Sequence, residues 1–180
     1  MADVLLDACC LINICSSGRL PEILRAVPHT WHICSAVAGE TLFVEVVVSG
    51  RRERSQVDLQ PWFAAGLVHP CEPERLDEVA ALVNYAARLD DGEAMCLALA
   101  KCRSWTVATD ERKGRRIARG DSIPTLNTVE IVRAWTEQVS ATPTVIHEVV
   151  NNIAVLGRYR PAVDAPSAEW WRVNGGSLST

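Results

Sequence analysis

Two short apolar segments of the chain each end on an aspartate, and each is followed by residues of helical character. Residues 4–6 lead into Asp7, and residues 105–109 lead into Asp110. Continuous apolar or β-branched runs of this length are typical of strands buried in a parallel sheet. The carboxyl ends of such strands share one sheet edge, where α/β proteins bind ligands. We therefore expect Asp7 and Asp110 to be neighbours, although a helix cap alone would also explain either residue.

The remaining segments alternate between apolar runs and helical periodicity. This alternation predicts an α/β fold with three α/β/α layers and a central, mainly parallel sheet of about four to five short strands. The chain of 180 residues is long enough for one domain. We expect residues 1–140 to form its body, and residues 141–180 to add a last helix and an aromatic arm. Further strands are predicted at 67–69 and 123–126, and helices at 21–27, 60–65, 74–89, 111–119 (closed by Gly120) and 143–157. Asn127 and Glu130 resemble a capping box for one more helix, which carries Ile131, Val132 and Trp135.

A nearly apolar segment carries two glutamates that could face a site. Ser35 is a candidate helix N-cap and Gly50 a candidate stop, so we expect a buried helix over residues 35–49. Glu40 and Glu45 would be about 140° apart around that helix, so both cannot face one site. We prefer Glu40 as the inward acid, with Glu45 as the alternative. Residues 51–54 (Arg-Arg-Glu-Arg) then read as a solvated charged loop, or alternatively as a phosphate contact.

A further acid opens the helix expected after residues 89–92. Glu93 lies in its first turn, where the helix dipole favours an anion. That is a sufficient structural reason for an acid, but a metal ligand would also be held rigidly there. Asp90 and Asp91 are interpreted as exposed turn residues, with Asp91 as a possible supporting group for the site.

The charge and cysteine content exclude some classes of function. The net charge is −4, from 18 basic and 22 acidic residues, which at first argues against a nucleic-acid ligand. Four carboxylates that hold a metal would account for the whole excess of negative charge, so the local distribution of charge, and not the net charge, decides whether a nucleic acid can bind.

The seven cysteines lack C-x-x-C spacing; we interpret them as reduced core residues of a cytoplasmic protein, not as disulfides or a zinc site. His29 and His32 are interpreted as surface and turn residues. No apolar run is long enough to span a membrane and no signal peptide is evident.

In order and context, the acids Asp7, Glu40, Glu93 and Asp110 resemble those of the PIN-domain nucleases. The resemblance covers roughly residues 4–135. It implies that these four acids bind the metal and carry catalysis, supported by Asn13, Thr109 and Asp91. The chain departs from the family pattern in two places: the usual second acid after the strand-end Asp110 is here Glu111, and residues 158–180 extend beyond the usual end.

The resemblance also implies an activity. Many PIN proteins are the toxins of prokaryotic toxin–antitoxin pairs (VapC-type) and cut RNA with Mg²⁺ or Mn²⁺, whereas others process RNA alone. We therefore expect an endoribonuclease with RNA as substrate, a small antitoxin-like partner protein and a homodimer. Four basic residues after Asp110 are placed to bind RNA phosphates: Arg112, Lys113, Arg115 and Arg116.

Two other classes of function compete with this interpretation. A phosphatase of the haloacid-dehalogenase type would need a second Asp two residues after Asp7, where this chain has Cys9, and a receiver domain would need paired acids that are not evident. A PIN-like module that binds RNA or protein without cutting is the second alternative. The aromatic arm, with Tyr159, Trp170 and Trp171, is expected either to cover its own core or to anchor a partner.

Overall fold

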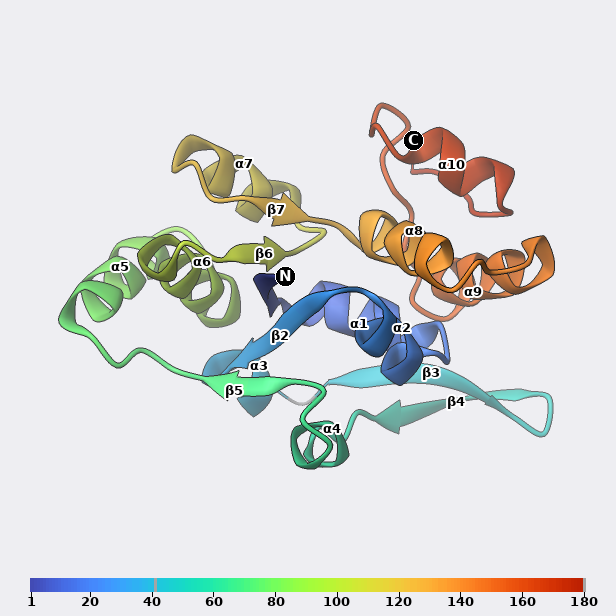
Figure 1. The fold of residues 1–180 in the computed structure, drawn as a ribbon, viewed down its shortest axis with the longest axis horizontal. Coiled ribbons are helices and arrows are strands. Elements are labelled where there is room, and N and C mark those ends of the chain that lie inside the picture. Colours follow the sequence, from blue (N-terminus) through green and yellow to red (C-terminus); the bar gives the residue numbers. More distant parts are fainter. Residues whose placement is uncertain (41, 180) are drawn as a thin grey trace. The chain divides into compact units, whose positions relative to one another are not determined.

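The computed structural model describes residues 1–40 and 42–179 and shows a mixed α/β fold (Figure 1). Its central sheet has five strands in the order β5-β2-β1-β6-β7, and neighbouring strands pair in parallel. The strands are β1 (Ala2–Leu6), β2 (His29–Cys34), β5 (His69–Cys71), β6 (Thr106–Ala108) and β7 (Thr125–Leu126). Helices flank the sheet, as in the three-layer fold of PIN-like proteins, so the predicted fold class is confirmed.

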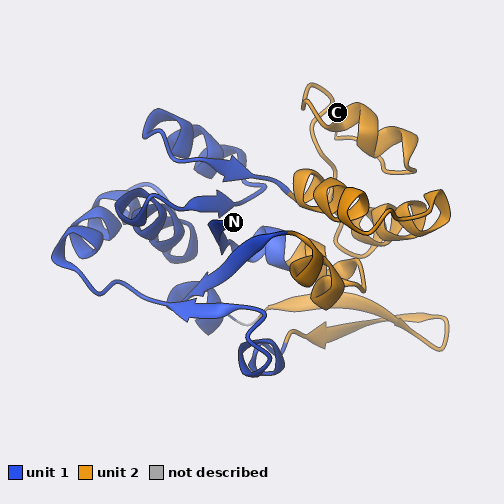
Figure 2. Cartoon of the chain, viewed as in Figure 1, with its two compact units in different colours: residues 1–11, 28–41, 58–127 blue, residues 12–27, 42–57, 128–180 orange. Residues whose placement is uncertain are grey.

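The chain divides into two compact units (Figure 2). Unit 1 consists of residues 1–11, 28–41 and 58–127 and contains the five-stranded sheet. Its helices are α3 (Ser35–Gly39), α4 (Gln60–Ala64), α5 (Leu76–Ala86), α6 (Asp91–Arg103) and α7 (Arg112–Gly120). α6 packs on β1, β2 and β6, and α5 lies along α6.

Unit 2 consists of residues 12–27, 42–57 and 128–180. It contains most of α1 (Ala8–Ser16), which begins in unit 1, together with a two-stranded sheet and four more helices. These elements are α2 (Leu20–Ala26), β3 (Phe43–Val48), β4 (Arg51–Gln56), α8 (Thr128–Gln138), α9 (Pro143–Val155) and α10 (Ala168–Val173).

The apolar run before Asp7 forms the middle strand of the central sheet. Val4, Leu5 and Leu6 are fully buried, and full burial of such a side chain stabilises the fold by roughly 1.5–3 kcal/mol. Leu6 pairs with Ala108 of β6, and the backbone N–H of Asp7 donates to the Ala108 carbonyl at 3.0 Å. The strand register therefore places Asp7 beside the end of β6, as the sequence predicted.

The helix predicted over residues 35–49 is wrong. α3 ends at Gly39, residue 41 lies outside the described residues, and β3 begins at Phe43. β3 pairs antiparallel with β4, so residues 51–54 form a strand and not a loop. Ser49 and Gly50 join the two strands with φ values of 52° and 78°, the positive pair that a two-residue type I′ hairpin turn requires. Gly50 therefore serves the hairpin turn, and the β-branched residues of the run, such as Val46 and Val47, favour a strand.

The strand β2 was also missed by the sequence interpretation. Its polar and aromatic residues hide the apolar pattern, yet it lies next to β1 and is buried from Trp31 to Cys34. His32 is therefore no surface residue: its Nε2 lies 2.8 Å from Asp3 Oδ1, and its ring stacks on Trp105. The strand predicted at 67–69 lies two residues further on, as β5.

The other predicted elements are present, with small shifts. β7 is an edge strand, and α2, α4, α5, α8 and α9 occupy the expected segments. Thr142 caps α9 by accepting from the Val145 N–H at 3.5 Å. Gly120 is the last residue of α7, and the left-handed φ expected of a cap there is found at Ser122. No helix in residues 1–40 or 42–179 is long and apolar enough to cross a membrane.

The segment after α9 contains a helix where an irregular arm was expected. Trp171, in α10, is fully buried and donates its Nε1–H to the Ser177 carbonyl at 3.0 Å. The Tyr159 ring meets the Trp171 ring edge-on, with centroids 5.4 Å apart. Residues 158–179 thus bury one of their two tryptophans, Trp171, within unit 2, which favours the core-covering role over a partner anchor for Trp171.

Candidate metal centre

Asp7 lies between β1 and α1 with only 4% of its surface exposed. Its Oδ1 accepts from the Ala8 N–H at 2.9 Å, and its Oδ2 accepts from the Thr109 hydroxyl at 2.8 Å and the Cys9 thiol at 3.1 Å. Burial raises the pKa of Asp7, and these three donors oppose the rise. Thr109 therefore orients the Asp7 carboxylate, which fits the supporting role predicted for it.

Glu93 lies in the first turn of α6, and Asp90 caps that helix. The Asp90 Oδ1 accepts from the Glu93 N–H at 2.8 Å, so the cap is provided by Asp90 and not by the Glu93 side chain. The pKa of Glu93 rises to about 7, first because of burial and then because of the charges of Asp90, Asp7 and Glu111. Sequence reasoning assigned Asp90 to an exposed turn; its position three residues before Glu93 was the N-cap signal that could have identified it.

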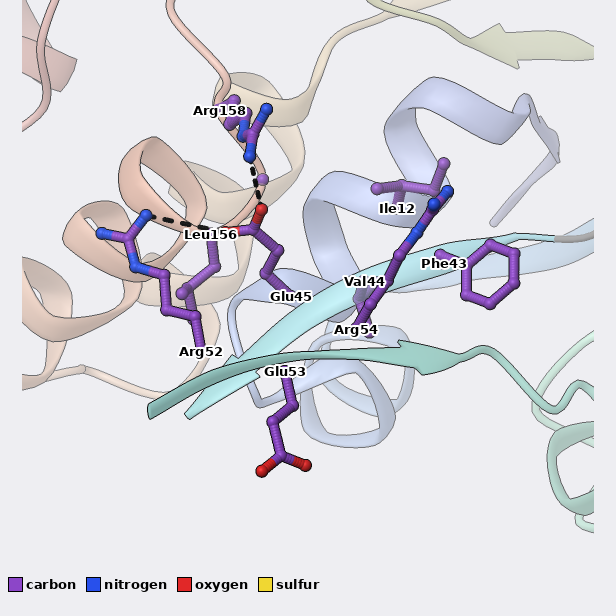
Figure 3. Close-up of a pocket in the computed structure, with 10 residues that line it drawn as sticks. Ile12, Phe43, Val44, Glu45, Arg52, Glu53, Arg54, Leu156 and Arg158 are labelled. Carbon is purple, nitrogen blue, oxygen red and sulfur yellow. Dashed lines mark hydrogen bonds and ion pairs between the residues drawn. The ribbon is translucent and has the colours of Figure 1, made fainter. Parts of the chain in front are cut away.

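Glu40 follows α3 directly and joins the same group of charges. Burial raises its pKa, and so do the charges of Asp7 and Asp90. Gly92 makes this approach possible, since a Cβ there would lie 2.6 Å from the Glu40 Oε1. Glu45, the alternative acid, instead lies in β3 of unit 2, where it pairs with Arg158 and Arg52 (Figure 3). Of the two glutamates, the structure thus places Glu40 in the electrostatic environment of Asp7.

Two cavities adjoin these carboxylates within unit 1. One has a volume of about 10 Å³, close to the space that a single water molecule needs, and is lined by Asp7, Glu93 and Thr109 among others. The other is an open cleft of about 570 Å³, lined by Glu40, Asp90 and Asp91 among others. Carboxylate oxygens are the ligands that Mg²⁺ and Mn²⁺ prefer, and a cation would relieve the repulsion that raises these pKa values. The residues therefore fit a divalent metal ion.

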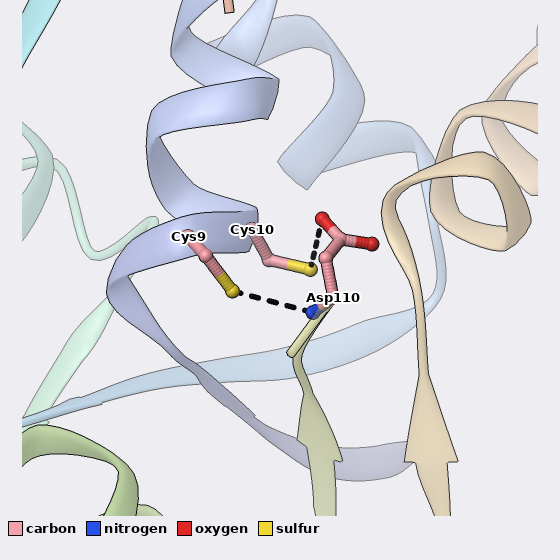
Figure 4. A group of neighbouring side chains, drawn as sticks. All are labelled: Cys9, Cys10 and Asp110. Atoms are coloured by element: carbon pink, nitrogen blue, oxygen red, sulfur yellow. Dashed lines mark hydrogen bonds between the residues drawn. The ribbon is translucent and has the colours of Figure 1, made fainter. Parts of the chain in front are cut away.

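Asp110 is hydrogen-bonded to two cysteines of α1. It does not cap α7, whose N-cap is Glu111. Its Oδ2 accepts from the Cys10 thiol at 3.3 Å, and its backbone N–H donates to the Cys9 Sγ at 3.2 Å (Figure 4). In residues 1–40 and 42–179, one group of three candidate ligand residues has its donor atoms within 4.8 Å of one another: Cys9, Cys10 and Asp110. The four predicted acids thus do not form one equally tight cluster.

The sequence profile of the PIN domain matches residues 3–159 of the chain. The chain belongs to the PIN-domain family. Comparisons with curated proteins and with solved structures gave no match. PIN domains are generally metal-dependent nucleases, and the acids and cysteines described above could bind a metal in this one.

The PIN domain carries a basic helix beside its carboxylates. The predicted phosphate-binding residues lie in α7: Arg112, Lys113 and Arg116 are exposed and Arg115 is half-buried. The positive charge of Lys113 lowers the pKa of Glu93, so Lys113 acts directly on the carboxylate group. Gly114 faces the same side, because a Cβ there would lie 3.3 Å from the Glu93 Oε1.

The remaining predicted supporting residues have separate positions. Asp91, the first residue of α6, is exposed and lines the open cleft. Asn13 belongs to unit 2, where its side-chain amide donates to the Thr128 hydroxyl at 3.4 Å. That contact orients Asn13 toward α8, and the role predicted for it at the metal centre stays a prediction.

Proposed function

We propose that this PIN domain is an endoribonuclease that depends on Mg²⁺ or Mn²⁺. One observation carries the proposal: Asp7 and Glu93 line a water-sized cavity, and the pKa values of Asp7, Glu40 and Glu93 are all raised, first by burial and then by neighbouring negative charge. The charge of Asp90 acts on all three acids, and the charge of Asp7 acts on Glu40 and Glu93. Such repulsion costs stability unless a cation neutralises it. A protein gains from that arrangement when the cation is part of its function.

The chain's own residues divide the work of phosphodiester hydrolysis. Asp7, fixed by Thr109, and Glu93, fixed at the start of α6, both line the small cavity, and Glu40 lines the neighbouring cleft. A bound divalent ion supplies Lewis-acid activation of the phosphate and of an attacking water. Arg112, Lys113 and Arg116 hold the neighbouring phosphates. The attacking water forms a bond to phosphorus and the bond from phosphorus to the 3′-oxygen breaks, so the products carry a 5′-phosphate and a 3′-hydroxyl.

The choice of RNA, and of a toxin role, is supported by the chain's resemblance to VapC-type members of the family. In that role a small antitoxin-like protein binds the toxin, the toxin forms a homodimer, and the target RNA is cytoplasmic. Induced expression of the chain with and without a small protein encoded beside it, followed by growth and total RNA integrity, tests this part. Growth that continues with intact RNA would remove the toxin role and leave the nuclease proposal in place.

The central experiment is a cleavage assay on a mixed RNA pool with the purified chain. We expect cleavage with Mn²⁺ or Mg²⁺, none after chelation, and recovery on adding the metal back. Asp7→Asn should lose the activity, whereas the matched control Glu137→Gln, an exposed acid in α8, should keep it. Equal rates for the wild type and Asp7→Asn would refute the metal-nuclease proposal.

A binding module that does not cut is the second candidate. The contacts of Asp110 favour it, because this acid is hydrogen-bonded to thiols and not grouped tightly with the other carboxylates. This candidate predicts RNA retention in a filter-binding assay without any product under all metal conditions. Cleavage by the wild type would exclude it.

A further inference from the structure

The first turn of α1 brings two adjacent cysteines to the end of β6. Cys9 is half-buried and Cys10 is fully buried. Figure 4 shows both side chains directed toward Asp110, from a part of the chain one hundred residues earlier in the sequence. The sequence alone does not indicate that these side chains lie together, because a zinc site is recognised in a sequence by the regular spacing of its cysteines.

The three side chains have the composition of a site for a soft metal. Their donor atoms all lie within 4.8 Å of one another, and tetrahedral Zn²⁺ with bonds of about 2.3 Å to sulfur holds its donors roughly 3.8 Å apart. A shift of about 1 Å in the side chains would therefore close the site. A fourth donor is at hand, since the Asp7 Oδ2 lies 3.1 Å from the Cys9 Sγ.

We propose that Cys9, Cys10 and Asp110 form a binding site for a thiophilic divalent ion, with Zn²⁺ as the physiological class. Thiolate ligands select Zn²⁺ over Mg²⁺, whereas the carboxylates of Glu40 and Glu93 suit the harder ion. Binding releases a proton from each thiol that becomes a thiolate ligand. The existence of this site does not depend on the proposed nuclease activity.

A functional consequence does rest on the proposed function. Asp110 belongs both to the group with the two thiols and to the predicted set of catalytic acids, and Asp7, another acid of that set, accepts a hydrogen bond from the Cys9 thiol. Zn²⁺ held by Cys9 and Cys10 would draw Asp110 into its own coordination shell. Zn²⁺ is then an inhibitor of the Mg²⁺- or Mn²⁺-dependent reaction, at concentrations far below those of the activating ion.

The decisive experiment uses Cd²⁺ as the probe and the reduced full-length chain without other metals. Cadmium–thiolate bonds give an ultraviolet charge-transfer band, so the readout is independent of RNA cleavage. We expect a band that saturates at one Cd²⁺ per chain. Cys9→Ser and Cys10→Ala should each weaken binding by more than about 100-fold, because each removes a ligand, whereas Cys102→Ser serves as the matched control and should keep the band.

The outcomes separate this inference from the proposed function. Wild-type binding retained in both the Cys9→Ser and the Cys10→Ala protein would overturn the site. Should a variant fold poorly, alkylation of the wild type decides: Zn²⁺ should protect the half-buried Cys9, and unchanged labelling of Cys9 would overturn the site as well. Zn²⁺ should also lower the cleavage rate of the wild type but not that of Cys9→Ser, each relative to its own zinc-free rate. A chain that binds Cd²⁺ through Cys9 but never cuts RNA would keep the site and refute the nuclease.

Discussion

A glutamate at the beginning of α6 has a raised pKa, whereas a glutamate that contacts the end of α6 has a lowered pKa. At its beginning, Glu93 lies among Asp90, Asp7 and Glu111, and its pKa rises to about 7. At its end, Arg103 donates to the fully buried Glu78 of α5 at 2.7 Å, and this contact lowers the pKa of Glu78 to about 2. The negative charge of Glu78 at the end of α6 is therefore balanced by Arg103, whereas the carboxylates at the beginning of α6 need a bound cation to balance their charge. Within unit 1, charges are balanced in the structural part around Glu78 and unbalanced in the candidate site around Glu93.

Glu93→Gln should produce the largest effect and should act on activity and stability in opposite directions. We expect metal-dependent cleavage to fall by about 1,000-fold or more, the equivalent of losing several kcal/mol of stabilisation by the metal centre. Without metal, the melting temperature should rise, because the repulsion by Asp90 and Asp7 is relieved. Rate assays and metal-free thermal melts of the variant and of Glu137→Gln measure both. A lower metal-free melting temperature for Glu93→Gln alone would contradict the idea of an unbalanced site.

Arg103→Met should act on stability through the balanced end of the helix. Removing the cation takes away the closest charge partner of the buried Glu78, and the more distant Arg75, at 3.9 Å, replaces it only in part. Breaking a buried pair typically destabilises a protein by about 3 kcal/mol or more, so we expect a loss of up to about 3 kcal/mol. Arg133→Met is the matched control, because Arg133 forms an exposed pair with Glu137 and its loss should change stability by less than about 0.5 kcal/mol. Urea unfolding provides the measurement. Equal midpoints for the two variants would show that the Glu78–Arg103 pair does not hold α5 to α6.

Gly92→Ala should weaken the metal centre without removing any ligand. The new methyl group would lie 2.6 Å from the Glu40 Oε1, so Glu40 must move away from the start of α6. We expect about 10-fold weaker binding of Mn²⁺ by calorimetry, the scale seen when a ligand's support is lost. Gly120→Ala, where no atom lies within 4 Å of the new methyl group, should bind as the wild type does. Unchanged affinity in Gly92→Ala would remove Glu40 from the set of metal ligands.

The pH dependence of metal-free stability should show both ends of α6 as two opposite slopes. Between the ordinary pKa of 4.5 and about 7, the folded chain keeps the Glu93 proton that the unfolded chain releases, so the free energy of unfolding falls as pH rises. Between 4.5 and about 2, the unfolded chain binds the Glu78 proton that the folded chain excludes, so the free energy of unfolding falls as pH falls. Glu93→Gln should flatten only the upper slope and Glu78→Gln only the lower one. Urea titrations at a series of pH values would contradict this assignment if either variant flattened the opposite slope.

The sequence predicts the parts of the site whose local signals are strong. The apolar runs before Asp7 and Asp110 identify two neighbouring strand ends, and the first-turn position of Glu93 follows from the helix after it. It fails where one signal has two meanings: Gly50 was interpreted as a helix stop, although in the structure it turns a hairpin. Glu40 was thus chosen from a helix that ends before it, and it lies near Asp7 for a different reason, the space left by Gly92.

The missed residues depend on contacts that span long sequence distances. The N-cap position of Asp90 could be read from the sequence, but only the structure shows that the charge of Asp7, far away in the sequence, acts on Glu93 together with that of Asp90. The meeting of Cys9 and Cys10 with Asp110 joins residues about one hundred positions apart. Periodicity and spacing report on neighbours within a few turns of chain, so they carry no information about such a meeting.

The strand order of the central sheet has a consequence for the time at which the site comes into being. β1, in the middle of the sheet, is made first, but its neighbour β6 and the edge strand β7 are made only after residues 106 and 125. Domains emerge from the ribosome from the N-terminus, at roughly 5–20 residues per second. About one hundred residues are therefore made after Asp7 before Thr109 and Asp110 exist and can pack beside it. The candidate site is therefore incomplete while residues 1–109 of the chain are being made.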